Sequence, residues 1–247
     1  LSYLVSLLKT DPGNTRLRLT LVERQLSIGD LEAARLTLAP LRATSGLVPV
    51  HVRLLEYRLW KLEAEKAEYG NGTDERLRQA LSELVQLEWR VADLVFLAEE
   101  AQFLRRPDLA TRFYEKLANA DQRGSERWIE RAVQSALCAG DYAGAAAIYL
   151  NRIRFADSAR QRTYFINGIK VLQSGNQLQA ALAAADTYLG EVAVNDEILM
   201  YLVQLARAAN DQARAQAYAR KLMHMSLMRS PVRIWTLLSG WLFAEAH

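Results

Sequence analysis

This sequence is poor in the residues from which most catalytic and metal sites are built. Its 247 residues include one cysteine, Cys138, and three histidines, His51, His224 and His247, which stand far apart along the chain. One cysteine cannot form a disulfide within the chain, and a metal site needs about three or four converging ligands. The sequence also lacks a glycine-rich phosphate loop and a nucleophile elbow. We therefore predict no metal site, no cofactor and no enzyme activity.

Long apolar runs and charge of one sign are also missing. No stretch reaches the roughly 18 consecutive apolar residues that a membrane-spanning helix needs. The net charge is +3, and 28 acidic residues are interspersed among 31 basic ones, of which 25 are arginine. Arginine suits paired hydrogen bonds to carboxylates, whereas this mixture of signs does not favour a face that follows a nucleic-acid backbone. We predict that the segment contacts neither a membrane nor nucleic acid.

What the sequence does contain is a spacing of 35 residues. Four alanines share it, and three sets of neighbouring, mostly apolar positions keep the same spacing. The alanines are Ala110, Ala145, Ala180 and Ala215, and the three sets are Leu94, Ile129, Tyr164 and Leu199; Leu97, Ala132, Asn167 and Leu202; and Ala101, Ala136, Val171 and Ala206. A fixed period of this length is typical of stacked helical repeats.

Each repeat is predicted to be a helix, a tight turn and a second helix. Apolar residues at a spacing of three and four predict the first helix. This helix ends at a residue that tolerates the left-handed conformation, and a residue that can cap the second helix follows. The pairs that fill these two places are Gly140 with Asp141, Gly175 with Asn176, and Asn210 with Asp211.

These small, aromatic and Gly-Asp-Tyr positions resemble the tetratricopeptide repeat (TPR). The matching residues are Leu97, Ala98, Ala101, Ala110, Tyr114 and Leu117 in one repeat, and Val133, Ala136, Gly140, Asp141, Tyr142, Ala145 and Tyr149 in the next. The tryptophan near the start of the family repeat is absent here, and the late proline survives only as Pro12. The resemblance implies an all-α fold, a right-handed superhelical solenoid of helix pairs.

The predicted organisation is one TPR solenoid segment over residues 1–247. It consists of a half repeat at 1–13, repeats at about 14–47, 48–90, 91–124, 125–159, 160–194 and 195–229, and a half repeat at 230–247. Because both ends divide a helix pair, we expect the segment to belong to a longer repeat protein.

One interval departs from the period. Ala34 and Ala110 are 76 residues apart, which is two periods plus six. We place the extra residues near Gly70, between a helix over about 50–69 and one that begins near Asp74. They form either an ordinary longer turn or an insertion that presents a loop to a partner.

The TPR resemblance implies that the first helices line a concave surface. The residues it places there, which we predict to contact a partner, are Glu99, Gln102, Arg127, Glu130, Gln134, Arg162, Phe165, Ile169, Gln173, Glu197, Met200, Gln204 and Arg207. Such a mixed groove could hold an extended peptide, a protein domain or a sugar polymer, or it could be hydrated and hold no ligand. The lysine and asparagine pair with which chaperone-binding TPRs grip a terminal carboxylate is absent.

Residues 4–14, the arginine content and the divided helix pairs at the ends together resemble the periplasmic TPR region of bacterial exopolysaccharide exporters, those of Pel polysaccharide in particular. This resemblance implies a non-catalytic periplasmic scaffold, part of an outer-membrane protein, that recruits a deacetylase or glycoside hydrolase and guides polymer to an outer-membrane pore. The expected partner is that enzyme, with the exopolysaccharide itself as a second candidate. The alternative is a cytoplasmic TPR adaptor that binds a peptide or protein partner.

Overall fold

The computed structural model describes residues 1–43, 50–67 and 73–229. Within these ranges the chain forms 13 α-helices and two short 3-10 helices, with no strand. The predicted fold class, an all-α repeat solenoid, is confirmed, whereas the right-handed superhelical winding stays a prediction. The half repeat expected at 230–247 and the residues around Gly70 lie outside the described residues.

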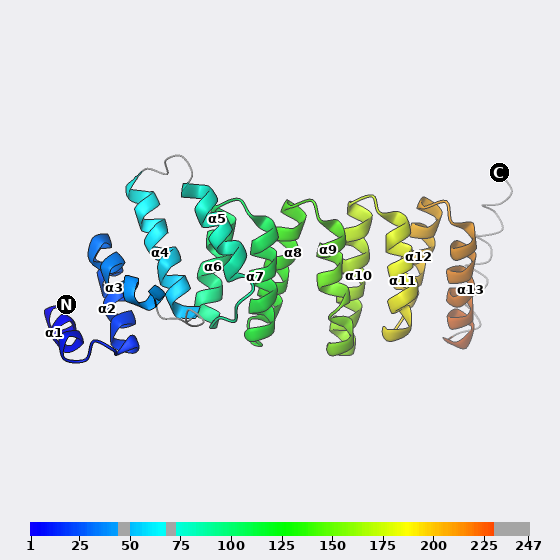
Figure 1. The fold of residues 1–247 in the computed structure, drawn as a ribbon. Coiled ribbons are helices and arrows are strands. Elements are labelled where there is room, and N and C mark those ends of the chain that lie inside the picture. The colour runs from blue at the N-terminus through cyan, green and yellow to red at the C-terminus, as the bar shows by residue number, and fades with distance from the viewer. Residues whose placement is uncertain (44–49, 68–72, 230–247) are drawn as a thin grey trace. The chain divides into compact units, whose positions relative to one another are not determined.

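The helices fall into two compact units, and unit 1 is Leu1–Arg131. Figure 1 labels the helices in chain order. Its helices are α1 (Ser2–Thr10), α2 (Thr15–Ser27), α3 (Leu31–Ala43), α4 (Val50–Lys66), α5 (Thr73–Leu84), α6 (Val91–Phe103) and α7 (Pro107–Ala120). From α1 to α7 each helix contacts the next, and α4 also contacts α2. The first helices of two successive pairs therefore lie against each other here.

Unit 2 begins at Ala132, so the division falls within α8 (Ser125–Cys138). The elements that follow are α9 (Tyr142–Leu150), η1 (Ile153–Phe155), α10 (Ser158–Ser174), α11 (Leu178–Tyr188), η2 (Leu189–Glu191), α12 (Asp196–Ala208) and α13 (Gln212–Arg229). From α9 to α13, each α-helix contacts the next.

The same turn joins five of the helix pairs. One residue takes a positive φ between 56° and 75°, and these residues are Gly29, Arg105, Gly140, Asn176 and Asn210. The N–H of the next residue donates to the carbonyl five residues earlier, over 2.8 to 3.0 Å in all five turns. This bond satisfies a carbonyl at the end of the first helix and reverses the chain. Asp30, Asp141 and Asp211 then cap the second helix by accepting from an N–H three residues on.

A buried alanine follows each of these turns at a fixed distance. It lies five residues after the left-handed residue, with an exposed fraction between 0% and 4%, and the five are Ala34, Ala110, Ala145, Ala181 and Ala215. A methyl group at this position lets the two helix backbones of a pair approach closely. Larger side chains such as Phe113, Tyr114 and Leu117 then fill the space along α7.

The structure corrects the predicted register of one repeat by one residue. Asn176 takes the left-handed conformation, whereas Gly175 has φ −79°. Gln177, not Asn176, therefore occupies the cap position, and its side chain makes no capping bond. Ala180 is exposed and Ala181 is buried. The strict 35-residue spacing fails here because Asn176 comes 36 residues after Gly140, and Asn210 follows 34 residues later.

Packing explains why a glycine precedes the turn. A Cβ atom at Gly175 would lie 2.5 Å from Cγ of Tyr142, which is closer than non-bonded atoms approach. Gly175 therefore serves the contact between α10 and α9, and the left-handed residue comes one position later. Gly175 and Asn176 are adjacent, and both residue types tolerate the left-handed conformation. The 35-residue spacing assigned that conformation to Gly175, which was wrong.

The corrected register predicts a contrast between two adjacent alanines. Ala181→Leu forces a larger side chain into the close contact within the α10–α11 pair, so we expect the free energy of unfolding to fall by about 1–3 kcal/mol. Ala180→Leu, at the exposed position, should change it by less than about 0.5 kcal/mol. Urea denaturation followed by circular dichroism measures both. Equal destabilisation by the two substitutions would contradict the register.

A second prediction concerns Arg105, which holds the left-handed conformation without being glycine. Arg105→Gly removes the clash between Cβ and the backbone, so we expect a gain in stability of roughly 0.5–1 kcal/mol. Gly140→Ala introduces that clash at the equivalent turn, and a loss of about 1 kcal/mol is expected. Both are read from the urea midpoint, and a loss of stability in Arg105→Gly would show that the turn is not strained.

Candidate functional site

A cleft lies between the first helices of unit 1. We call it the first-helix cleft, and its volume is about 350 Å³. Its lining residues are Glu23, Leu26 and Ser27 of α2, Leu55, Arg58, Lys61, Leu62 and Glu65 of α4, and Phe96 of α6. The charged residues of α4 follow one another at a spacing of three and four, which places them on one face of that helix. Leu26 and Leu55 are buried and belong to the core shared by α2, α3 and α4.

Cations of α4 lie against aromatic rings of α6. The guanidinium carbon of Arg58 lies 4.9 Å from the centroid of Phe96. The ammonium of Lys61 lies 5.5 Å from Phe96 and 6.0 Å from the centroid of Phe103. A cation at such distances is attracted to the face of the ring, by about 0.5–1 kcal/mol where water can reach it. These contacts hold both basic side chains at the wall of the cleft.

Lys61 is bound to a buried carboxylate. Glu100 of α6 is only 6% exposed, and it accepts a hydrogen bond from Nζ of Lys61. It also accepts one from the hydroxyl of the fully buried Tyr57, over 3.0 Å. A buried carboxylate is tolerated because both of its oxygens are hydrogen-bonded and one partner is a cation. The charge of Lys61 is therefore used to hold α4 against α6.

Arg58 is held differently, because its donors are not used. Its closest acidic group is Asp93, with 3.9 Å between Nη2 and Oδ1, which is too long for a hydrogen bond. Asp93 is bound instead by Nε of Arg90, over 3.1 Å. Among the described residues Arg58 donates no hydrogen bond, and its side chain is 37% exposed. The cleft therefore presents a positioned guanidinium with free donors above an apolar floor.

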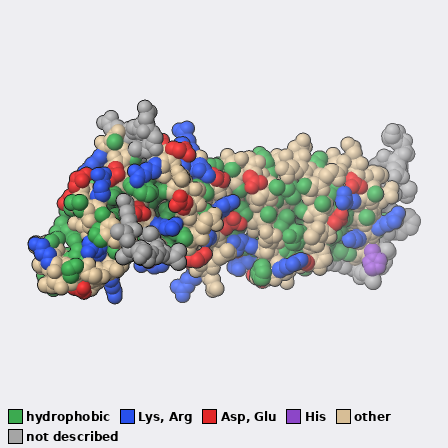
Figure 2. All heavy atoms as spheres, viewed as in Figure 1, with side chains coloured by type: hydrophobic (Ala, Val, Ile, Leu, Met, Phe, Trp, Pro, Cys, Tyr) green, Lys and Arg blue, Asp and Glu red, His purple; other side chains and the backbone are tan. Residues whose placement is uncertain are grey.

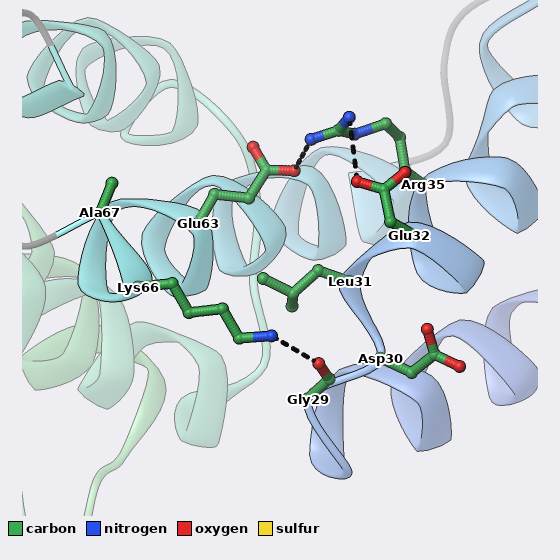
Figure 3. Close-up of a pocket in the computed structure, with 8 residues that line it drawn as sticks. All are labelled: Gly29, Asp30, Leu31, Glu32, Arg35, Glu63, Lys66 and Ala67. Atoms are coloured by element: carbon green, nitrogen blue, oxygen red, sulfur yellow. Dashed lines mark hydrogen bonds and ion pairs between the residues drawn. The ribbon is translucent and has the colours of Figure 1, made fainter.

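A second, larger cleft in the same unit has a structural role. It has a volume of about 430 Å³ and lies where the turn between α2 and α3 meets the end of α4 (Figure 3). Arg35 bridges Glu63, over 2.6 Å, and Glu32, over 3.3 Å. The hydrogen bond to Glu63 is the main cause of the raised pKa of Arg35. Lys66 donates to the carbonyl of Gly29, over 2.9 Å.

The basic groups of this larger cleft are thus already paired. They join the left-handed turn at Gly29 to α4 and leave no cation without a partner in the cleft. Figure 2 shows the same mixture of signs more widely, because acidic and basic side chains are intermingled over unit 1 on the face in view. What distinguishes the first-helix cleft is therefore the free guanidinium of Arg58 and not its size.

Polar side chains also connect the helices of unit 2. The hydroxyl of Tyr218 donates to Asp186, over 2.5 Å, and Nε of Arg214 donates to the other oxygen of Asp186, over 2.7 Å. The pKa of Tyr218 is raised by burial and then by its bond to Asp186. The pKa of Asp211 is lowered by the N–H and then by the guanidinium of Arg214. These bonds hold α13 to α11 and to the turn before it.

Most of the residues predicted for the concave surface are exposed. The exposed ones are Glu99, Gln102, Arg127, Glu130, Gln134, Gln173, Glu197, Met200, Gln204 and Arg207, and Arg162 is half-buried. In unit 2, the hydroxyl of Tyr201 donates to Gln173, over 2.6 Å, and the four residues named on α12 follow a spacing of three and four. The binding of a partner by this surface stays a prediction.

Two of the predicted surface residues are core residues instead. Phe165 and Ile169 are 0% exposed, so neither can contact a partner directly. The cause is the one-residue shift of this repeat, because the positions that the 35-residue spacing assigned to the groove are core positions in the corrected register. Conversely, the sequence prediction missed Arg58, Lys61 and Phe96. Because the interval between Ala34 and Ala110 is irregular, α4 does not follow the 35-residue spacing of the later repeats. The sequence signal that could have indicated this cleft was Arg58 and Lys61, which are three residues apart and stand beside leucines.

Two kinds of site were also sought over the described ranges. In residues 1–43, 50–67 and 73–229, no three histidine, cysteine, aspartate or glutamate side chains are placed to share a metal ion. Over the same part of the chain, no helix combines the length and the apolar character that crossing a membrane requires.

The buried pair of Lys61 and Glu100 yields a stability prediction. Lys61→Met leaves the carboxylate of Glu100 without its cation, so we expect the free energy of unfolding to fall by about 2 kcal/mol. This is less than the full cost of an unpaired buried charge, because Lys61 is 23% exposed and water can reach the site. Adding Glu100→Gln should restore most of the loss, and Lys9→Met, at an exposed position, should change stability by less than about 0.5 kcal/mol. Urea denaturation of the four proteins checks this, and no recovery in the double variant would contradict it.

Comparison with known proteins does not identify a family. No protein-family model matches this chain, and neither does any curated protein. Among solved structures, a tetratricopeptide repeat protein from Parabacteroides merdae is similar over 96% of this chain and 88% of its own, with 15% sequence identity and a TM-score of 0.37. By their own geometry, the left-handed turns and the buried alanines that follow them, the helix pairs of this protein are TPR-like.

Proposed function

We propose that this chain is a non-catalytic protein-interaction scaffold and that the first-helix cleft binds its protein partner. The observation that carries this proposal is the guanidinium of Arg58, which lies over the ring of Phe96 and makes no hydrogen bond to a described residue. Arginine and aromatic residues are enriched in the energetically dominant centres of protein interfaces. The exposed polar residues predicted along the first helices would supply further, weaker contacts.

We further propose that the partner is a polysaccharide-modifying enzyme, a deacetylase or a glycoside hydrolase, in the periplasmic part of an exopolysaccharide exporter. The support for this step is the resemblance of residues 4–14 and of the arginine-rich composition to the repeat regions of such exporters. The scaffold would act by positioning: many weak contacts along repeated helices raise the local concentration of the enzyme near the polymer and the outer-membrane pore. A cytoplasmic adaptor is the alternative that the same fold allows.

The test is direct binding of the purified chain to a purified deacetylase or glycoside hydrolase that acts on an exported polysaccharide of the same organism, measured by biolayer interferometry. Phe96→Ala should weaken binding by about 10-fold or more, since it removes an aromatic anchor worth at least about 1.4 kcal/mol. Phe155→Ala is the matched control, because Phe155 is 89% exposed and lies in unit 2, outside the cleft. Its affinity should equal that of the parent.

The possible outcomes separate the two parts of the proposal. Absence of binding to the enzyme, with the helical fold intact by circular dichroism, would refute the export role. Binding that Phe96→Ala leaves unchanged would refute the assignment of the cleft.

A further inference from the structure

We infer that the first-helix cleft recognises an internal acidic segment of its partner, in which one aspartate or glutamate side chain binds Arg58 and a neighbouring apolar side chain lies against Leu62, the half-buried leucine of the cleft. This inference rests on the proposed function and names the chemistry of the partner.

The guanidinium of Arg58 can bind a carboxylate of a partner. Its guanidinium carbon lies over the ring of Phe96, at 4.9 Å, so this contact engages none of its N–H donors. The edge of a guanidinium matches the two oxygens of a carboxylate, and such paired bonds are among the stronger hydrogen bonds in proteins. Asp93, at 3.9 Å, does not supply them within the protein. A partner carboxylate would therefore form bonds that Arg58 lacks.

The remaining charges of the cleft limit the number of acidic groups to one. Lys61 is bound to Glu100 and lies 3.7 Å from Glu65, so it offers little further attraction. Glu23, exposed on α2, lines the opposite side of the cleft. A second carboxylate in the segment would meet Glu23 and be repelled. The site should therefore select one acidic residue and not a polyacidic run.

The size and floor of the cleft favour a peptide. A volume of about 350 Å³ is near the lower limit for ligand pockets, and it suits a few side chains better than a folded domain. Leu62 is half-buried and packs against the leucines of the core, and it offers a surface that removes part of an apolar side chain from water. A sugar polymer offers a carboxylate only if it is acidic, and it has no comparable apolar group.

The experiment is selection of random seven-residue peptides, displayed within a loop so that neither terminus is free, on the immobilised full chain. We expect the retained peptides to carry one Asp or Glu within two residues of Leu, Ile, Met or Phe. Synthetic versions with blocked termini should bind Arg58→Gln at least 10-fold more weakly in fluorescence anisotropy. They should bind Arg53→Gln, the control on the same helix, as they bind the parent. Replacing their acidic residue by the amide should cost a similar factor.

Several results would overturn the inference. These are a selection that retains no peptide, retained peptides without enrichment in Asp or Glu, equal binding to Arg58→Gln, and stronger binding of polyacidic peptides. Displacement of the peptides by hexagalacturonate at lower concentration than by free peptide would assign the site to an acidic sugar instead. If the enzyme requires Phe96 but not Arg58, this inference fails while the scaffold proposal stands. If acidic peptides bind and the enzyme does not, this inference stands and only the export role fails.

Discussion

The close approach of two helices at a buried alanine is the constraint on which this structure depends. In five pairs the alanine stands five residues after a left-handed turn and is almost inaccessible to water. Because a methyl group is the side chain that fits between the backbones, the turn and the alanine together fix how the second helix lies on the first. Each first helix then has one face committed to its pair and to its neighbours, and the rest of its surface is left for other contacts.

The pairing of charges in unit 1 determines which basic residue of the first helices has donors available to a partner. Glu100 is buried, so it needs a cation and a donor, and Lys61 and Tyr57 supply them across the contact between α4 and α6. Arg90 likewise serves the buried Asp93. Once both buried acids are satisfied, Arg58 is the basic residue of the first-helix cleft whose donors are unused within the described part of the chain. Its availability is a consequence of how the buried acids are paired.

The sequence predicted the fold because turns and small residues leave a strong local signal. Gly140-Asp141-Tyr142 and Ala145 were sufficient to identify a helix pair. The same reasoning placed Phe165 and Ile169 on the surface, because Gly175 was assigned the left-handed role that Asn176 has. A glycine can be required because another group packs closely against its backbone or because the residue has a positive φ. The sequence alone does not show which of these reasons applies. Arg105 in a left-handed turn and the pairing of Lys61 with Glu100 depend on tertiary contacts that no local pattern shows.

The irregular pair of α4 and α5 is where the candidate site arises, and its packing gives a reason. In place of the buried alanine, α5 carries Leu77 and Leu81 in its core, and α4 contacts α2, α3 and α5. With Leu55, Tyr57 and Leu59 all buried, α4 is held on several sides. A side chain that emerges from a helix so constrained, and that also rests on Phe96, loses little freedom when it binds. Because α4 departs from the repeat, the rigid position of Arg58 belongs to this helix pair. A position in a regular helix pair would recur in the other pairs along the chain.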